Sequence, residues 1–115
     1  MNKKYDLEER TEQFAKNVIQ LCKSLHKNTV NIELISQLVR ASGSVEANYI
    51  EANEALSKKD FFHRIKICRK ESKEARYWIR LIVSANPEFE KEASPLSQEA
   101  TELMNIFGAI LRKST

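Results

Sequence analysis

The fold is decided by the stretch Ser57–Ala85, SKKDFFHRIKICRKESKEARYWIRLIVSA. Apolar or small residues recur in it in alternating steps of four and three, which places them on one face of a helix. A second row beside it mixes apolar residues with acids. The first row is Phe61, Ile65, Cys68, Ser72, Ala75, Ile79 and Ile82, and the second is Ile67, Glu71, Glu74, Trp78, Leu81 and Ala85. The pattern predicts one helix over residues 58–85. Ser57 is its predicted N-cap in a capping box with Asp60, and Asn86-Pro87 ends it.

Three further helices are predicted over about 7–26, 31–56 and 95–112. Their expected caps are Asp6, then Thr29 or Asn31, then Ser94 with Pro95 at the first helical position. Residues 88–93 are expected to form an acidic linker, and the small residues 42–44 to permit a close helix approach. The apolar stripes are Phe14, Val18, Leu21, Cys22 and Leu25, then Ile35, Leu38, Ser42, Val45, Tyr49, Ala52 and Leu56, then Leu96, Ala100, Leu103, Met104, Phe107, Ile110 and Leu111.

These helices predict a single all-α domain over residues 1–115, an antiparallel up-down four-helix bundle. The alternative, a three-helix fold with a loose C-terminus, would leave the apolar run 103–111 in water. The chain has 2 Gly and 2 Pro in 115 residues, too few for the many turns of a β-rich fold. It shows no membrane span and no signal peptide, so we expect a cytoplasmic protein whose Cys22 and Cys68 are reduced core residues.

The main functional clue is a row of basic residues on one face of the 58–85 helix. Residues 58–80 include nine basic and three acidic residues, a formal charge of +6 in a chain that totals +3. Such a concentrated field attracts polyanions, although many charged rows are only solvated helix surface. The residues predicted to bind nucleic acid are Lys59, Lys66, Arg69, Lys70, Lys73, Arg76 and Arg80.

A second polar set lies among apolar neighbours on the 31–56 and 58–85 helices. Isolated buried charges are very costly, so Glu71 and Glu74 should be paired, with Arg40, Arg64 or Lys70 as possible partners. Three interpretations remain open: internal ion pairs, a subunit interface, or a catalytic site that combines Glu71 and Glu74 with Tyr49. The set is Arg40, Asn48, Tyr49, Glu51, Arg64, Glu71, Glu74 and Trp78.

No catalytic residue, metal ligand set or cofactor motif is predicted. The two histidines, His26 and His63, do not form the Glu-x-x-His motifs of di-iron bundles. The sequence has no Gly-rich phosphate loop and no nucleophile elbow. One Trp and three Tyr are too few to predict a base-stacking surface. We therefore expect a protein that binds rather than catalyses.

Several long segments resemble the signature of a known bacterial family. They are Gln37–Ala52 (QLVRASGSVEANYIEA), Ser57–Phe61 and Lys70–Leu81 (KESKEARYWIRL), with weaker similarity at Tyr5–Thr11 and Phe14-Ala15. The family comprises four-helix-bundle proteins encoded in intervening sequences of large-subunit ribosomal RNA genes. One departure is visible, because the family pattern often has a small residue at the position of Glu46.

The resemblance implies a bundle that assembles into a ring-shaped homopentamer, in a family whose biochemical role is not established for most members. It also implies kinship with the accessory variability protein of diversity-generating retroelements, which binds a reverse transcriptase and nucleic acid. Together with the basic row, this predicts a non-enzymatic oligomer that binds RNA or DNA. The alternative is an oligomeric adaptor that binds a protein partner through the same basic face.

Overall fold

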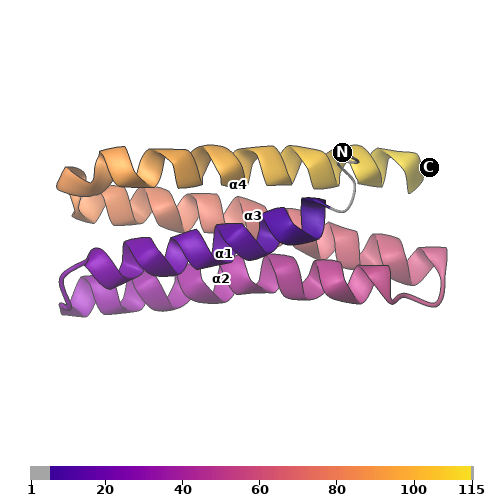
Figure 1. Ribbon diagram of the computed structural model, residues 1–115, viewed down its shortest axis with the longest axis horizontal. Helices are drawn as coiled ribbons and strands as arrows, with labels where there is room; N and C mark the ends of the chain where they lie inside the picture. Colours follow the sequence, from indigo (N-terminus) through magenta and orange to yellow (C-terminus); the bar gives the residue numbers. More distant parts are fainter. Residues whose placement is uncertain (1–5, 115) are drawn as a thin grey trace.

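The computed structural model describes residues 6–114, which form an antiparallel bundle of four α-helices (Figure 1). The helices are α1 (Asp6–Ser24), α2 (Thr29–Asn53), α3 (Lys58–Ala85) and α4 (Glu90–Leu111). Short 3-10 helices, η1 (Pro87–Phe89) and η2 (Arg112–Ser114), flank α4. The bundle is elongated, with extents of 44 × 29 × 20 Å. The predicted four-helix architecture is confirmed, and α4 packs along α3, so the three-helix alternative is wrong.

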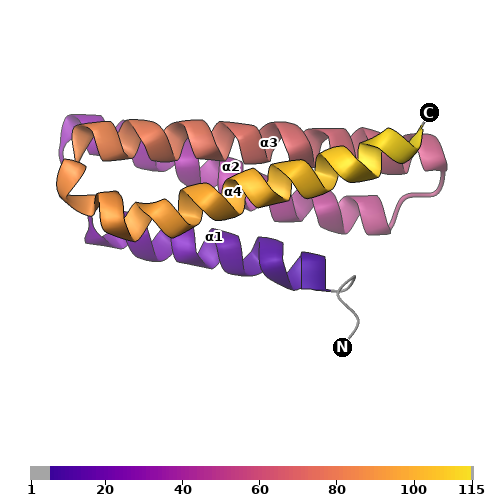
Figure 2. The same cartoon turned by 90° about the horizontal axis from the view of Figure 1, so that it is seen from above.

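The helices do not contact one another equally. α3 packs extensively on both α2 and α4, whereas α1 packs mainly on α2 and touches α4 much less. Seen from above, α1 and α4 diverge toward the N-terminus of α1 (Figure 2). The α3 helix is therefore the central element, and its sides face different neighbours.

The start of α3 agrees with the sequence, while the limits of α2 differ. Ser57 caps α3, its hydroxyl accepting from the Asp60 amide at 3.0 Å. Asn28 caps α2, its side chain accepting from the Asn31 amide at 2.8 Å, so the expected caps Thr29 and Asn31 are wrong. Asn28 is the residue that satisfies an otherwise free first-turn N–H. The expected cap of α1, Asp6, already belongs to that helix, and its side chain lies outside the described residues.

At its other end α2 stops three residues earlier than predicted. Ala52 is its last buried residue, and the chain then turns so that Ser57 can begin α3. Leu56, expected on the buried stripe, is consequently 98% exposed.

The acidic segment before Pro95 is helical, which corrects the predicted linker and the predicted Ser94 cap. Phe89, Ala93 and Leu96 continue the apolar stripe of α4 backward in steps of four and three. Ala93 and Leu96 are buried, and Phe89 packs on the core. Pro95 lies inside the helix and lacks the N–H that the Lys91 carbonyl would accept. Apolar burial outweighs that single lost bond, and the first-turn acids Glu90 and Glu92 suit the positive end of the helix dipole.

The core follows the predicted stripes, centred on Phe14, Phe107, Leu38 and Ile65. Cys22 and Cys68 are free and buried, as predicted, and burial raises their thiol pKa to about 11 and about 12. The close helix approach expected at residues 42–44 is absent at Gly43. A Cβ atom placed on this glycine would have no neighbouring atom within 4 Å. The residue is exposed, so α2 turns its small centre partly to solvent.

One end of the bundle is closed by two buried asparagines, Asn31 and Asn86, whose pairing is not predicted from the sequence. Each side-chain amide donates to the other's oxygen: Asn31 to Asn86 at 3.0 Å and Asn86 to Asn31 at 2.9 Å. Their remaining N–H groups donate to the His26 and Ile82 carbonyls, each at 2.9 Å. This clamp joins the α1–α2 connection to the end of α3, where both hairpins turn (Figure 1).

Candidate nucleic-acid interface

The side of α3 that faces α2 holds the acids of the predicted polar set. Glu71 is buried, at 7% exposure, and Glu74 is half-buried. Arg40 of α2 reaches both, at 3.6 Å to Glu71 and 3.3 Å to Glu74. Lys70 adds a contact to Glu74 at 3.8 Å. The acids are therefore paired within one chain, as the internal ion-pair interpretation expected.

This pairing leaves two polar atoms unsatisfied among the described residues. The second carboxylate oxygen of Glu71, Oε1, and the Trp78 indole nitrogen are buried without hydrogen-bond partners. Both lie on the α2 side of α3, seven residues apart and thus on one face. Buried polar atoms without partners are uncommon, so this seam is not an optimised core.

The remaining residues of the polar set are dispersed. Arg64 donates to the Asn48 side chain at 3.0 Å, so it does not serve the acids. Tyr49 packs against Phe107 of α4, with ring centroids 6.0 Å apart. Glu51 is exposed on α2. Tyr49 and the two acids therefore contact different elements within the chain.

The outer side of α3 carries most of the cations of that helix, with one acid, Glu74, at its edge. Lys59, Lys66, Arg69, Lys70, Lys73 and Arg80 are exposed, and Arg76 is half-buried. Glu71 is buried toward Arg40, whereas Glu74 contacts Arg40 and Lys70 and lies at the edge of this surface, beside Lys73 and Arg76. Of the seven, Lys70 alone forms an ion pair within residues 6–114. We call these seven side chains the basic face.

The neighbouring surface of α4 is uncharged where the arginines cross it. Arg76 donates to the Thr101 hydroxyl at 3.3 Å. Arg69 crosses α4 at Gly108, where a Cβ atom placed on the glycine would lie 3.6 Å from the Arg69 Nε. Farther along, the surface includes an acid, because Arg80 borders a hollow of about 240 Å³ together with Glu90, Ser94 and Ser97 of α4. Hydroxyl groups thus lie at the edge of the basic face, and that of Thr101 donates its proton to the Ser97 carbonyl at 3.0 Å.

Two features of this surface were missed by sequence reasoning. Arg112 lies near Gly108, as Arg69 does: a Cβ atom placed on the glycine would lie 4.0 Å from the Arg112 guanidinium. Arg112 therefore extends the basic face. Its position becomes predictable only once α4 is known to run antiparallel to α3. The second is Tyr77, which is 45% exposed among the cations.

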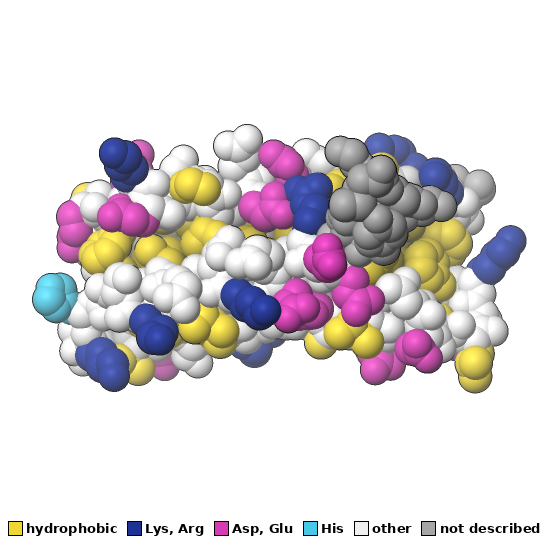
Figure 3. Space-filling view, viewed as in Figure 1, with side chains coloured by type: hydrophobic (Ala, Val, Ile, Leu, Met, Phe, Trp, Pro, Cys, Tyr) yellow, Lys and Arg dark blue, Asp and Glu magenta, His cyan; other side chains and the backbone are white. Residues whose placement is uncertain are grey.

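The opposite side of the bundle has a different charge pattern. Acidic side chains gather near the middle of the face made by α1, α2 and α4 (Figure 3). There Arg10 bonds Glu99 at 2.7 and 3.0 Å and Glu102 at 3.1 Å. The hydrogen bonding of Arg10 to the Glu99 carboxylate is the largest cause that raises the pKa of Arg10. Glu99 and Glu102 of α4 thus lie away from the basic face, on the side of α1.

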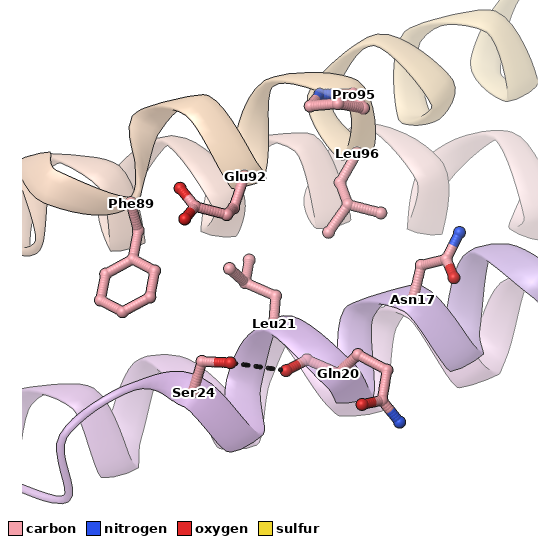
Figure 4. Close-up of a pocket in the computed structure, with 8 residues that line it drawn as sticks. All are labelled: Asn17, Gln20, Leu21, Ser24, Phe89, Glu92, Pro95 and Leu96. Carbon is pink, nitrogen blue, oxygen red and sulfur yellow. Dashed lines mark hydrogen bonds between the residues drawn. The ribbon is translucent and has the colours of Figure 1, made fainter.

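A hollow of about 330 Å³ opens between α1 and α4 on this side (Figure 4). Leu21 and Leu96 point toward one another across it, and Glu92 is the charged residue among those that line it. Ser24 directs its hydroxyl to the Gln20 carbonyl at 3.2 Å. Within residues 6–114, no group of three or more His, Cys, Asp or Glu side chains is arranged to hold a metal ion. The hollow offers a polyanion no cation.

The sequence matches the profile of the 23S rRNA-intervening sequence protein over residues 3–109. The chain belongs to this family. The fold is also similar to a crystal structure of a protein of unknown function from the S23 ribosomal protein family of Bacteroides thetaiotaomicron VPI-5482. The TM-score is 0.81 at 23% identity, covering 91% of this chain and 97% of the other. No curated protein is significantly similar to the chain. No helix within residues 6–114 is long and apolar enough to cross a membrane.

Glu46, where the family pattern often has a small residue, lies half-buried on α2. Desolvation raises its pKa above the ordinary value of 4.5, and the charges of Glu12 and Glu8 on α1 raise it further. Lys16 partly offsets this. The departure therefore places a third acid beside two others instead of adding an ion pair.

Proposed function

We propose that this member of the 23S rRNA-intervening sequence protein family binds RNA or DNA without catalysis, through the basic face of α3. The observation that carries the proposal is the separation of charges on that helix. Glu71 and Glu74 are held by Arg40, whereas most cations of the helix have no ion-pair partner within residues 6–114. Unpaired cations close together cost stability, and phosphates would relieve that repulsion.

The geometry of the row suits a polyanion better than a small anion. Lys59 and Arg80 are 21 residues apart, which corresponds to about 30 Å along a helix. The row is straight because all its members lie on one rigid helix. Regularly spaced phosphates can therefore occupy several cations at once, and binding should weaken steeply as salt rises.

Absence of catalysis is part of the proposal. The acids that could act as a pair are tied to Arg40, and Tyr49 packs on Phe107 instead of on them. A catalytic site built from these three groups would need contributions from more than one chain.

The test is fluorescence anisotropy with a labelled RNA hairpin, starting at ~50 mM salt. The test variant is Lys66→Glu/Lys73→Glu/Arg80→Glu, three exposed residues without in-chain ion pairs. At ~100 mM salt we expect its Kd to rise at least about 100-fold, because each lost phosphate contact removes counterion release. A matched control, Lys23→Glu/Lys27→Glu/Lys91→Glu, changes net charge equally with exposed residues on α1, the α1–α2 connection and α4.

Absence of wild-type binding at ~50 mM salt would contradict the proposal. Equal losses in both triple variants would show that net charge, and not the basic face, attracts the RNA. Capture of one protein through the basic face, resistant to nuclease, would instead favour the protein-adaptor alternative.

We also propose that the bundle assembles into a homo-oligomeric ring, a pentamer. An exposed row on the outer side of α2 supports self-association: Ile32, Val39, Gly43 and Ile50, at spacings of seven, four and seven. Val39 is 37%, Ile50 40% and Ile32 57% exposed. An apolar row on a helix surface is the seam that packed helices use. Several copies of the basic face in one ring would increase affinity through avidity.

Light scattering coupled to size exclusion tests the assembly. We expect about five times the mass of one chain, and we expect Val39→Glu/Ile50→Glu to give monomers that remain helical. A wild-type monomer at ~100 μM would contradict the ring, while leaving nucleic-acid binding to be judged by the anisotropy experiment.

A further inference from the structure

Tyr77 is an aromatic side chain in the middle of the basic face. Its side chain is 45% exposed and lies among charged side chains. Lys73 stands four residues before it and Arg80 three residues after it, so both flank the ring on the same helix surface. Together with Lys70, Glu74 and Arg76 they surround a shallow hollow of about 380 Å³.

The ring of Tyr77 is restrained by its neighbour. It makes an edge-to-face contact with Trp78, with centroids 5.0 Å apart and planes at 65°. Trp78 is half-buried against the core, so it supports the tyrosine from the α2 side. A restrained ring loses little conformational entropy when a flat partner stacks on it.

A second hollow, of about 440 Å³, adjoins the first and shares Lys70 and Lys73 with it. Ile67 supplies an apolar surface there, and His63 lies at its far edge. The two hollows therefore follow one another along α3, with Lys70 and Lys73 between them. A nucleic-acid strand whose bases are turned toward α3 could place its bases in the hollows and its phosphates on the cations between them.

We infer that Tyr77 stacks on a base of a single-stranded or unpaired nucleic acid, while Lys73 and Arg80 hold the flanking phosphates. This inference rests on the proposed nucleic-acid binding, and it specifies that the ligand has unpaired bases. Along the helix axis, Lys73 lies about 6 Å and Arg80 about 4.5 Å from Tyr77, within reach of one nucleotide's backbone. Bases of a duplex are stacked on each other and cannot cover the ring, so unpaired strands bind more tightly than duplexes of equal charge.

The experiment compares three labelled ligands of equal phosphate number: single-stranded RNA, a strand without bases, and a duplex. Tyr77→Leu removes the ring and keeps an apolar side chain, and Tyr77→Phe keeps the ring. For single-stranded RNA, Tyr77→Leu should raise Kd about 10-fold or more, the size of one base–aromatic stack. Tyr77→Phe should stay within about twofold of wild type, and the base-free strand should bind all three proteins equally.

Thermal melting by circular dichroism verifies that each variant is folded. Loss of base-free binding in Tyr77→Leu, equal to its loss of RNA binding, would overturn the stacking role and assign Tyr77 to structure alone. Unchanged RNA binding in Tyr77→Leu would overturn it too, with the proposed function intact. If none of the three ligands binds wild type, the proposed function itself fails.

Discussion

The two polar sides of α3 differ in how their charges are satisfied. Toward α2, Glu71 and Glu74 share Arg40 at 3.3–3.6 Å, so their charges are paired inside the chain. On the outer side, Lys66, Lys73 and Arg80 are exposed without ion pairs among residues 6–114. The same helix thus carries one set of charges that fixes its position against α2 and another that the fold does not use. The second set is the one available to another molecule.

Removing a polar group that the fold uses should have the largest effect on stability. Asn86→Ala leaves the Asn31 side-chain oxygen buried without its partner, so we expect a loss of about 2 kcal/mol in free energy of unfolding. Urea denaturation followed by circular dichroism measures it. Asn105→Ala, at an exposed position of α4, is the control and should change stability by less than about 0.5 kcal/mol. Equal effects would mean that the clamp contributes nothing.

Arg40→Ala should have a smaller effect, because Arg40 is half exposed and water can partly replace it. We expect a loss of about 1 kcal/mol, since the buried Glu71 carboxylate loses its countercharge. Adding Glu71→Gln should restore part of this loss, and a double-mutant cycle in urea measures the coupling. Strictly additive losses would show that the two residues do not interact. RNA affinity should stay unchanged.

Glu46→Gln should have the smallest effect and the opposite sign. The pKa of Glu46 is raised in the folded protein, so its ionisation destabilises the fold as pH rises above its ordinary value of 4.5. At pH 7 the substitution should therefore stabilise by about 0.5 kcal/mol, the size of interactions between exposed charges. Below pH 4 the carboxyl is protonated in both states and the gain should vanish. A gain that persists there would assign the effect to side-chain shape instead.

The sequence was sufficient for the four helices because their apolar periodicity is strong. The sequence did not predict helix ends where a local signal and burial conflict. Ser94-Pro95 is a typical helix start, yet Pro95 lies inside α4 because the apolar residues Phe89 and Ala93 extend that helix toward its N-terminus. The Asn31–Asn86 clamp joins residues far apart in sequence, and no local pattern marks such a pair.

The basic residues were predictable because they share one helix, whose register alone places them on a common face. What the sequence could not decide is which charges are left unpaired. That depends on Arg40 reaching across from α2, and on the uncharged side of α4, with Thr101 and Gly108, lying beneath the arginines. The exposure of Tyr77 depends on the same arrangement.

The slope of log Kd against log salt for single-stranded RNA tests the central claim most directly, because it counts phosphate contacts. Wild type is compared with Lys66→Gln/Lys73→Gln/Arg80→Gln and with Arg40→Gln. Three lost phosphate contacts should reduce the magnitude of the slope by about 2, whereas Arg40→Gln should leave it unchanged. An unchanged slope in the triple variant, or an equal reduction in both variants, would contradict the assignment of the outer side of α3 to nucleic acid.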